Sequence, residues 1–223
     1  RPRGCYWKAA ASTLWFTKHP DDQVACDSTR SCLCVPDSGS YEISSHGCRM
    51  KTMVTLESGE DVDVHGDNAA ASPLAELQAT GLTPSESSPQ RHFTINAGAT
   101  LRLRDLRMTG GRVRDRATSS DASKRGGFIY MKSGALTMNN VIANGINCGG
   151  LAFSCARVGG AVFAGGDAEV VIQDSTFQQF RASSSGGAIY FFERSKASIT
   201  ATTFIENTAG TACEIGGGVG QGG

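Results

Sequence analysis

Apolar residues recur two positions apart in four segments of the chain, and each segment then meets a polar or small residue. The segments begin at residues 101, 136, 170 and 197 and read LRLRDLRM, LTMNNVIA, VVIQDSTF and ASITATTF. Alternation with a period of two indicates a β-strand with one buried face. The fifth position is Asp105, Asn140, Asp174 or Ala201, and three of these four residues favour sharp turns, so we expect the chain to bend there.

One further apolar residue follows each bend, and glycine pairs separate the segments. In three segments this residue is Met108, Phe177 or Phe204, three positions after the bend. In the second segment the pattern shifts by one position and predicts Ile142, two positions after the bend. Short apolar strands, FIY, AVF and AIY, follow the glycine pairs that begin at residues 126, 159 and 186, and Gly216–Gly218 open another copy. The sequence VDVHG at 62–66 is a weaker, earlier copy. One repeat therefore contains about two strands and several turns.

The spacing of the repeat selects the fold class. Successive copies begin 35, 34 and 27 residues apart, which is typical of stacked units that cannot bury their apolar faces alone. We predict an all-β fold, a single-stranded right-handed parallel β-helix (solenoid), in which Leu103, Met138, Ile172 and Ile199 stack along one axis. The alternative is a β-sandwich, which requires tight hairpin turns, and Asn144-Gly145 is the one such signal.

The chain divides into a cap and a helix in this interpretation. Residues 1–50 are predicted to form a small disulfide-rich cap, because an open coil exposes unpaired strand edges and apolar side chains. Residues 51–223 form the β-helix, with 68–91 as an insertion loop in which Ser72 and Pro73 begin a short helix that ends near Ala79. The glycine-rich ending suggests that the helix continues beyond residue 223.

The eight cysteines favour disulfide bonds and an oxidising compartment, so we expect a secreted, extracellular or cell-surface protein. Five lie within the first 48 residues: Cys5, Cys26, Cys32, Cys34 and Cys48. Because five is odd, at least one pairs elsewhere or stays free, and Cys213 is a candidate partner. Cys148 and Cys155 are expected to close a local loop. The alternative is a zinc site with His19 and His46, although the usual paired Cys-x-x-Cys spacing is missing.

The charge balance excludes some classes of partner. Twenty-one basic residues match twenty-one acidic residues, so no net field attracts nucleic acid or an anionic membrane. No apolar run approaches the roughly 18 residues that a membrane span requires. We therefore expect no nucleic-acid partner and no membrane span.

The acidic stretch ESGEDVDVHG is a candidate metal site. Asp61 and Asp63 point to the same side of a strand, and their carboxylate oxygens suit Ca²⁺. The alternative is an ion-pair arrangement: if VDV pairs with LRL of the next coil, Asp63 lies beside Arg102 and His65 beside Arg104, and neighbours of opposite charge stabilise sheets.

A basic stretch is the second candidate site. Arg102 and Arg104 alternate with apolar leucines and are followed by Arg107, so these arginines could bind an anionic glycan such as a sulfated or uronic polysaccharide. The alternative is a solvated face without a ligand.

Catalytic chemistry finds little support in the sequence. The acids between residues 126 and 205 are scattered and form no compact pair of the kind that glycoside hydrolases use. A nucleophile-elbow motif and a phosphate-binding loop are both missing. The four histidines, His19, His46, His65 and His92, are dispersed, and each is predicted to be a surface or turn residue.

The repeat motifs carry a family resemblance over roughly residues 90–220. GGAIY with FIEN, echoed by GGAVF with FQQF and by GGFIY, resembles the Gly-Gly-Ala-Ile and Phe-x-x-Asn repeats of the chlamydial polymorphic outer membrane protein family. More broadly it is similar to the right-handed parallel β-helix superfamily that includes pectate lyases. Only Phe204 to Asn207 keeps Phe-x-x-Asn intact. The resemblance implies surface display and adhesion without a shared active site. The amino-terminal GCYWKAAASTLWFTKHP and ACDSTRSCLC resemble cysteine-rich segments of secreted microalgal proteins.

These observations favour a non-catalytic extracellular module with a structural, adhesive or assembly role. Its expected partners are other subunits or copies of itself, because open solenoid ends can stack through strand pairing into a filament or a larger complex. The alternative is a polysaccharide-binding or polysaccharide-degrading protein, a lyase or hydrolase, that uses the face of Asp61, Asp63, Arg102 and Arg104.

Overall fold

The computed structural model describes an all-β chain, and its described residues contain no α-helix. The described residues are 5–8, 13–16, 38–43, 48–50, 53–66, 74–79, 91–111, 113, 124–145 and 156–210. Of residues 5–8, 13–16, 38–42 and 48–49 the structure describes the backbone only.

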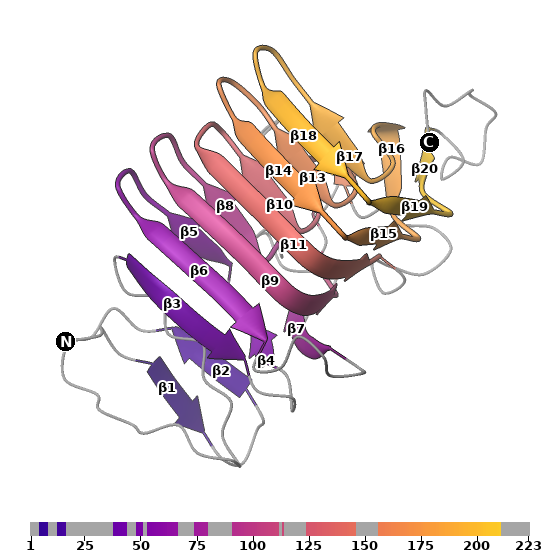
Figure 1. Ribbon diagram of the computed structural model, residues 1–223. Coiled ribbons are helices and arrows are strands. Elements are labelled where there is room, and N and C mark those ends of the chain that lie inside the picture. The colour runs from indigo at the N-terminus through magenta and orange to yellow at the C-terminus, as the bar shows by residue number, and fades with distance from the viewer. Residues whose placement is uncertain are drawn as a thin grey trace.

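The strands form three sheets, and in each sheet successive strands lie side by side along the length of the molecule (Figure 1). The twelve-stranded sheet contains β1 (Cys5–Lys8), β2 (Thr13–Phe16), β3 (Ser38–Ile43), β4 (Cys48–Met50), β6 (Asp61–Gly66), β7 (Ala75–Ala79), β9 (Thr100–Thr109), β11 (Ala135–Asn144), β14 (Glu169–Gln173), β15 (Thr176–Gln178), β18 (Lys196–Thr200) and β19 (Thr203–Ile205). The five-stranded sheet contains β5 (Val54–Leu56), β8 (Phe93–Ile95), β10 (Ile129–Met131), β13 (Val162–Ala164) and β17 (Ile189–Phe191). The three-stranded sheet contains β12 (Ala156–Val158), β16 (Arg181–Ser185) and β20 (Thr208–Ala209).

Parallel pairing in register dominates these sheets, and this is consistent with a β-solenoid. Apart from β1 and β2, all the strand pairs of the described residues are parallel. We call one passage through the five-stranded sheet, the twelve-stranded sheet and, where it is present, the three-stranded sheet a coil. The predicted stack is confirmed, because Leu103 pairs with Met138, Met138 with Ile172, and Ile172 with Ile199.

The predicted bends are also confirmed: they lie within β9 and β11, and they separate β14 from β15 and β18 from β19. Asp105, Asn140, Asp174 and Ala201 have φ between 46° and 55°, the left-handed conformation that Asn and Asp tolerate best. The Asn140 side chain donates a hydrogen bond to the Asp105 carboxylate over 2.8 Å, so the bends of two coils are joined. Because one left-handed residue interrupts the alternation, Leu103 and Leu106 both point into the core although they are three positions apart.

The predicted shift at Ile142 is wrong. Ala143, fully buried, pairs with both Met108 and Phe177, whereas Ile142 lies on the outer side of β11 and is only partly buried. The register is therefore unbroken, and an alanine occupies the inner position of this coil. The apolar pattern suggested Ile142 because it is the larger of the two neighbouring apolar residues, but Ile142 points outward and Ala143 points inward.

The predicted helix from Ser72 to Ala79 is also wrong in its described part, which is strand β7. Ala75, Leu77 and Ala79 are buried on alternate positions, and β7 pairs in parallel with β4 and β9. Alternation in a five-residue strand was obscured by the alanines, which have high helix propensity. Parallel pairing thus reaches into segments predicted as the cap and the insertion, because β3 and β4 pair with β6 and β7.

The two glycines of each pair serve different purposes. The first, Gly126, Gly159 or Gly186, has φ between 62° and 65°, where a side chain is strained. The second makes room for the next coil, since a Cβ atom on Gly160 would lie 2.0 Å from the carbonyl oxygen of Gly187. Conformation and close approach together explain why the pair recurs.

Replacement of Gly160 by alanine is expected to lower the free energy of unfolding by about 1 to 3 kcal/mol, because the obstructing atom is backbone of the next coil and cannot rotate away. Urea denaturation followed by circular dichroism measures this change. Gly59→Asn is the control: no atom lies within 4 Å of a Cβ there, and asparagine tolerates positive φ. A Gly160→Ala chain as stable as the Gly59→Asn chain would contradict the interpretation.

Candidate functional site

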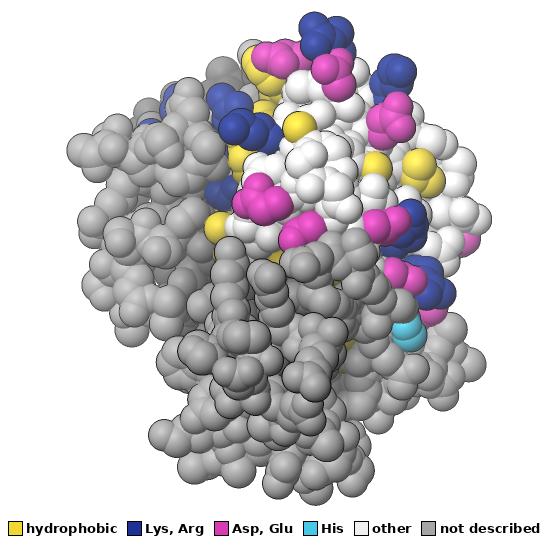
Figure 2. Space-filling view, turned by 90° about the vertical axis from the view of Figure 1, so that its left-hand side faces the viewer, with side chains coloured by type: hydrophobic (Ala, Val, Ile, Leu, Met, Phe, Trp, Pro, Cys, Tyr) yellow, Lys and Arg dark blue, Asp and Glu magenta, His cyan; other side chains and the backbone are white. Residues whose placement is uncertain are grey.

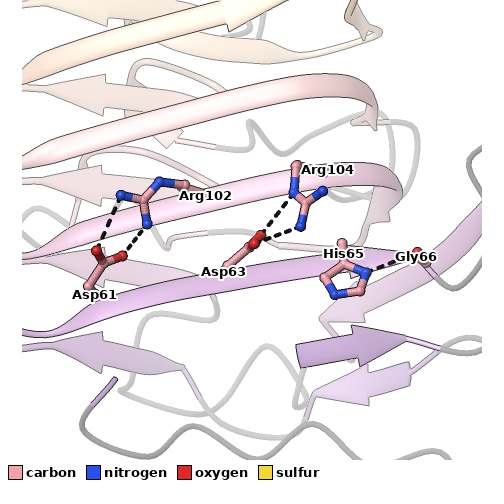
Figure 3. Close-up of polar contacts among 6 residues, drawn as sticks. All are labelled: Asp61, Asp63, His65, Gly66, Arg102 and Arg104. Atoms are coloured by element: carbon pink, nitrogen blue, oxygen red, sulfur yellow. Dashed lines mark hydrogen bonds and ion pairs between the residues drawn. The ribbon is translucent and has the colours of Figure 1, made fainter. Parts of the chain in front are cut away.

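The acidic and basic candidate residues meet on the outer side of β6 and β9. The predicted register is confirmed, with Asp63 opposite Arg102 and His65 opposite Arg104. The ion pairs nevertheless run diagonally, because Arg102 binds Asp61 and Arg104 binds Asp63 (Figure 3). A diagonal neighbour is within reach of a side chain as long as arginine.

Both pairs are bidentate and remain partly exposed to solvent. Arg104 donates from Nε to Asp63 Oδ1 over 3.2 Å and from Nη2 to Oδ2 over 2.7 Å, and Arg102 donates to both oxygens of Asp61. The pKa of each guanidinium is raised, chiefly by its hydrogen bonds to the carboxylate. Exposed pairs of this kind contribute about 0 to 1 kcal/mol to stability.

The ion pairs occupy the side chains that were expected to bind Ca²⁺ or an anionic glycan on this face. Each carboxylate faces an arginine of the next coil, and in the described part of the chain no three His, Cys, Asp or Glu side chains are placed to hold a metal ion. His65 has its Nδ1 atom 3.2 Å from the carbonyl oxygen of Gly66. The arrangement is therefore a row of neutralised charge along two coils.

Arg107 does not share the face of Arg102 and Arg104. It follows the bend at Asp105 and lies between Glu76 of β7 and Ile142 of β11. The three arginines come from one strand, but the bend directs Arg107 to a different part of the surface.

A second set of polar pairs, which the sequence analysis missed, lies at the turns between the five-stranded and twelve-stranded sheets. Arg194 donates two hydrogen bonds to Asp167, over 2.7 and 2.9 Å, and Asn96 donates to Glu57 over 2.8 Å. The pKa of Asp167 is lowered, first by the hydrogen bonds from Arg194. Figure 2 shows acidic and basic side chains beside one another on this side of the molecule. The sequence signal for these turns was a small residue followed by glycine, which recurs at Ser58-Gly59, Ala97-Gly98 and Ser133-Gly134.

His92 lies at a bend directly before β8 and is fully buried, so a surface position for it is wrong. Its ring lies 4.6 Å from the ring of Phe128, and its Nε2 atom is 3.2 Å from both the Ala79 nitrogen and the Leu77 carbonyl oxygen. Burial lowers the pKa of His92 to about 4. The neighbouring Arg91 is also buried and places its guanidinium 4.9 Å from the centre of the Tyr130 ring. The sequence gives no sign that His92 is buried, because it is a single histidine outside any recognisable motif.

Aromatic rings form two columns that run from coil to coil. On the outer side of the five-stranded sheet, Phe163 stacks between Tyr130 and Tyr190 with centroid distances of 5.5 and 5.9 Å. After the bend, Phe177 stacks on Phe204 at 5.4 Å. Tyr190 and Phe204 are the last rings of their columns in the described chain, and both belong to its last coil.

The last described coil, formed by β17 to β20, presents apolar side chains to solvent. Ile199 is 38% exposed and Phe204 is 47% exposed, whereas Ile172 and Phe177, directly below them in the same ladders, are fully buried. A hollow of about 560 Å³ opens at this end, lined in part by Ile189, Tyr190, Ile199 and Phe204. We call this surface the open end.

The disulfide prediction lies outside the described residues. None of the eight cysteine side chains is described, and Gly216–Gly218 fall outside the described ranges as well. Cysteine pairing and the further glycine-rich copy therefore stay predictions.

The burial of His92 generates a pH dependence. The unfolded chain binds a proton at this residue near pH 6.5 and the folded chain only near pH 4, so the contribution to stability is complete above pH 6.5 and is lost as the pH falls toward 4. At pH 5 the loss is about 2 kcal/mol relative to pH 7.5. We expect His92→Phe to show a smaller decrease in the free energy of unfolding than the wild type between these pH values. His65→Asn, on the partly exposed β6 position, serves as the control. Equal decreases in wild type and His92→Phe would contradict the assignment.

No protein-family model matches this chain, and no curated protein or solved structure matches it either. In the described part of the chain, no helix is long and apolar enough to cross a membrane.

Proposed function

We propose that this chain is a non-catalytic structural and assembly module, a right-handed parallel β-helix that joins other subunits, or copies of itself, through the open end. An extracellular or cell-surface location, with a disulfide-rich amino-terminal segment, belongs to the same proposal. The even number of cysteines supports it.

One observation carries the proposal: the open end interrupts ladders whose side chains are buried in the lower coils wherever the structure describes them. Positions equivalent to Ile199 and Phe204 are buried in the preceding coils, so the exposed fractions of 38% and 47% mark the point where the next layer of side chains is missing among the described residues. Exposed apolar groups gathered at one place are a common sign of an interaction surface.

The strand edges of this coil support the same proposal. In the described structure β17 pairs only with β13, β18 only with β14, and β19 only with β15. The opposite edge of each strand carries backbone donors and acceptors that a further strand would satisfy. Surface apolar area and edge hydrogen bonding therefore coincide at the open end.

The Phe-x-x-Asn motif, on which the proposed relationship with polymorphic outer membrane protein repeats rests, also has a physical role. Asn207, the Asn of Phe-x-x-Asn, accepts a hydrogen bond from the Phe180 nitrogen over 3.0 Å and donates one to the Phe177 carbonyl oxygen over 2.9 Å. Its side chain thus ties one coil to the next. The motif is structural, in keeping with a module without catalysis.

Polysaccharide binding or cleavage is not part of this proposal. The arginines expected to bind an anionic glycan, Arg102 and Arg104, each bind a carboxylate of the neighbouring coil. A glycan carboxylate would have to compete with Asp61 and Asp63 for the same guanidinium groups. No observation at this face favours that exchange.

Sedimentation velocity measured over a range of protein concentrations tests the proposal. We expect the wild-type chain to associate and Ile199→Asp to remain monomeric, because a buried unpaired carboxylate opposes burial of the open end. Val171→Asp is the matched control: Val171 is 44% exposed on the outer face of β14 and does not belong to the end surface. A monomeric wild type, or an Ile199→Asp chain that associates as the wild type does, would contradict the proposal.

A further inference from the structure

We infer that the partner of the open end is a polypeptide coil of this same repeat, parallel to β17, β18 and β19 and in register with them, so that association is head-to-tail. This inference rests on the proposed function and specifies its partner. The occupant is a strand-forming polypeptide that contains the alternating pattern of the chain itself.

The first argument is continuity with the interfaces already present between coils. The register from β10 to β13 and from β13 to β17 is constant, with Ile129 opposite Val162 and Val162 opposite Ile189. The same holds from β11 to β14 and from β14 to β18. The open end therefore presents the same arrangement of backbone groups that each lower coil presents to the coil above it.

The second argument concerns side chains. The rings of Phe177 and Phe204 are inclined by only 14°, and those of Phe163 and Tyr190 by only 17°, so each column leaves one ring face directed along the stack. Tyr190 and Phe204 both line the hollow at this end. An apolar residue at the equivalent position of a parallel coil would cover each ring face, as Phe204 covers Phe177.

The third argument excludes a second copy attached by its own open end. Each coil follows an asymmetric path: a three-residue strand, a turn, a five-residue strand, a bend at Ala201, and a second three-residue strand. If two open ends faced each other across a two-fold axis, the path of one coil, viewed along the stack, would be the mirror image of the other. When one strand of the two coils paired, the strands after the bend would therefore point in different directions and could not pair. A parallel coil meets β17, β18 and β19 together.

A glycan or a lipid fits the open end less well. Either could cover the apolar rings, but neither offers the regular alternation of amide donors and carbonyl acceptors that three strand edges require. The last coil also carries Glu193, Arg194, Lys196 and Glu206, two acidic and two basic side chains, so charge does not oppose a neutral partner.

The probe is a synthetic peptide of residues 186–207, GGAIYFFERSKASITATTFIEN, added to the full chain. We expect it to bind, to slow amide hydrogen exchange in β18 and β19, and to block association of the chain. The matched control peptide contains Asp in place of Ile189, Ile199 and Phe204. On the protein side, Ile199→Asp should weaken peptide binding at least about tenfold, whereas Val171→Asp should leave it unchanged.

Orientation is tested with nitroxide labels on the peptide. A parallel peptide in register should broaden the NMR signals of Ile189 when its amino terminus is labelled and those of Phe204 when its carboxyl terminus is labelled. The reverse pattern, or equal binding of the native and Asp-substituted peptides, would overturn the inference.

The association state separates this inference from the proposed function. Head-to-tail contacts do not close on themselves, so we expect species larger than dimers. Association that depends on Ile199 but stops at a dimer would overturn the inference and leave the proposed function standing. A chain that binds the peptide at β18 but never associates would overturn the proposed self-assembly, and of the inference only the parallel, in-register pairing of a coil with β17, β18 and β19 would stand.

Discussion

Parallel pairing of successive coils in one constant register is the constraint on which the rest of this structure depends. Because the register does not change, each residue lies on its equivalent about 30 positions away, and the inward ladders stay buried from coil to coil below the last described coil. Leu101, Leu136 and Val170 form one such ladder and are all buried. Apolar side chains that would leave a single strand half exposed thus become a continuous core.

The same constraint explains the positions where side chains are restricted. A bend must occur at the same place in every coil, so left-handed residues such as Asp105 and Asn140 lie directly above one another and bond to each other. Where two coils approach most closely, only glycine fits, as at Gly160 below the Gly187 carbonyl group. The turn residues and the glycine pairs are consequences of stacking, and they need no catalytic explanation.

Stacking also determines where chemistry remains available. Along the sides of the coils, opposite charges neutralise one another, as Asp63 does with Arg104. Along the axis, by contrast, the last described coil presents the same strand edges and apolar ladders as the described coils below it. Ile199 and Phe204 are exposed there, and no further described strand covers them. The assembly role that we propose rests on this surface.

The sequence by itself determined the period, the buried alternation, the bends and the glycine pairs, because each is a local consequence of backbone geometry repeated in every coil. Only the tertiary structure decided which residues of neighbouring coils touch. It placed Ala143 inward and Ile142 outward, turned β7 into a strand, buried His92, and paired Arg104 with Asp63 along a diagonal. These outcomes depend on contacts between residues roughly 15 to 40 positions apart, and the local pattern of a segment contains no information about the residues that will cover it.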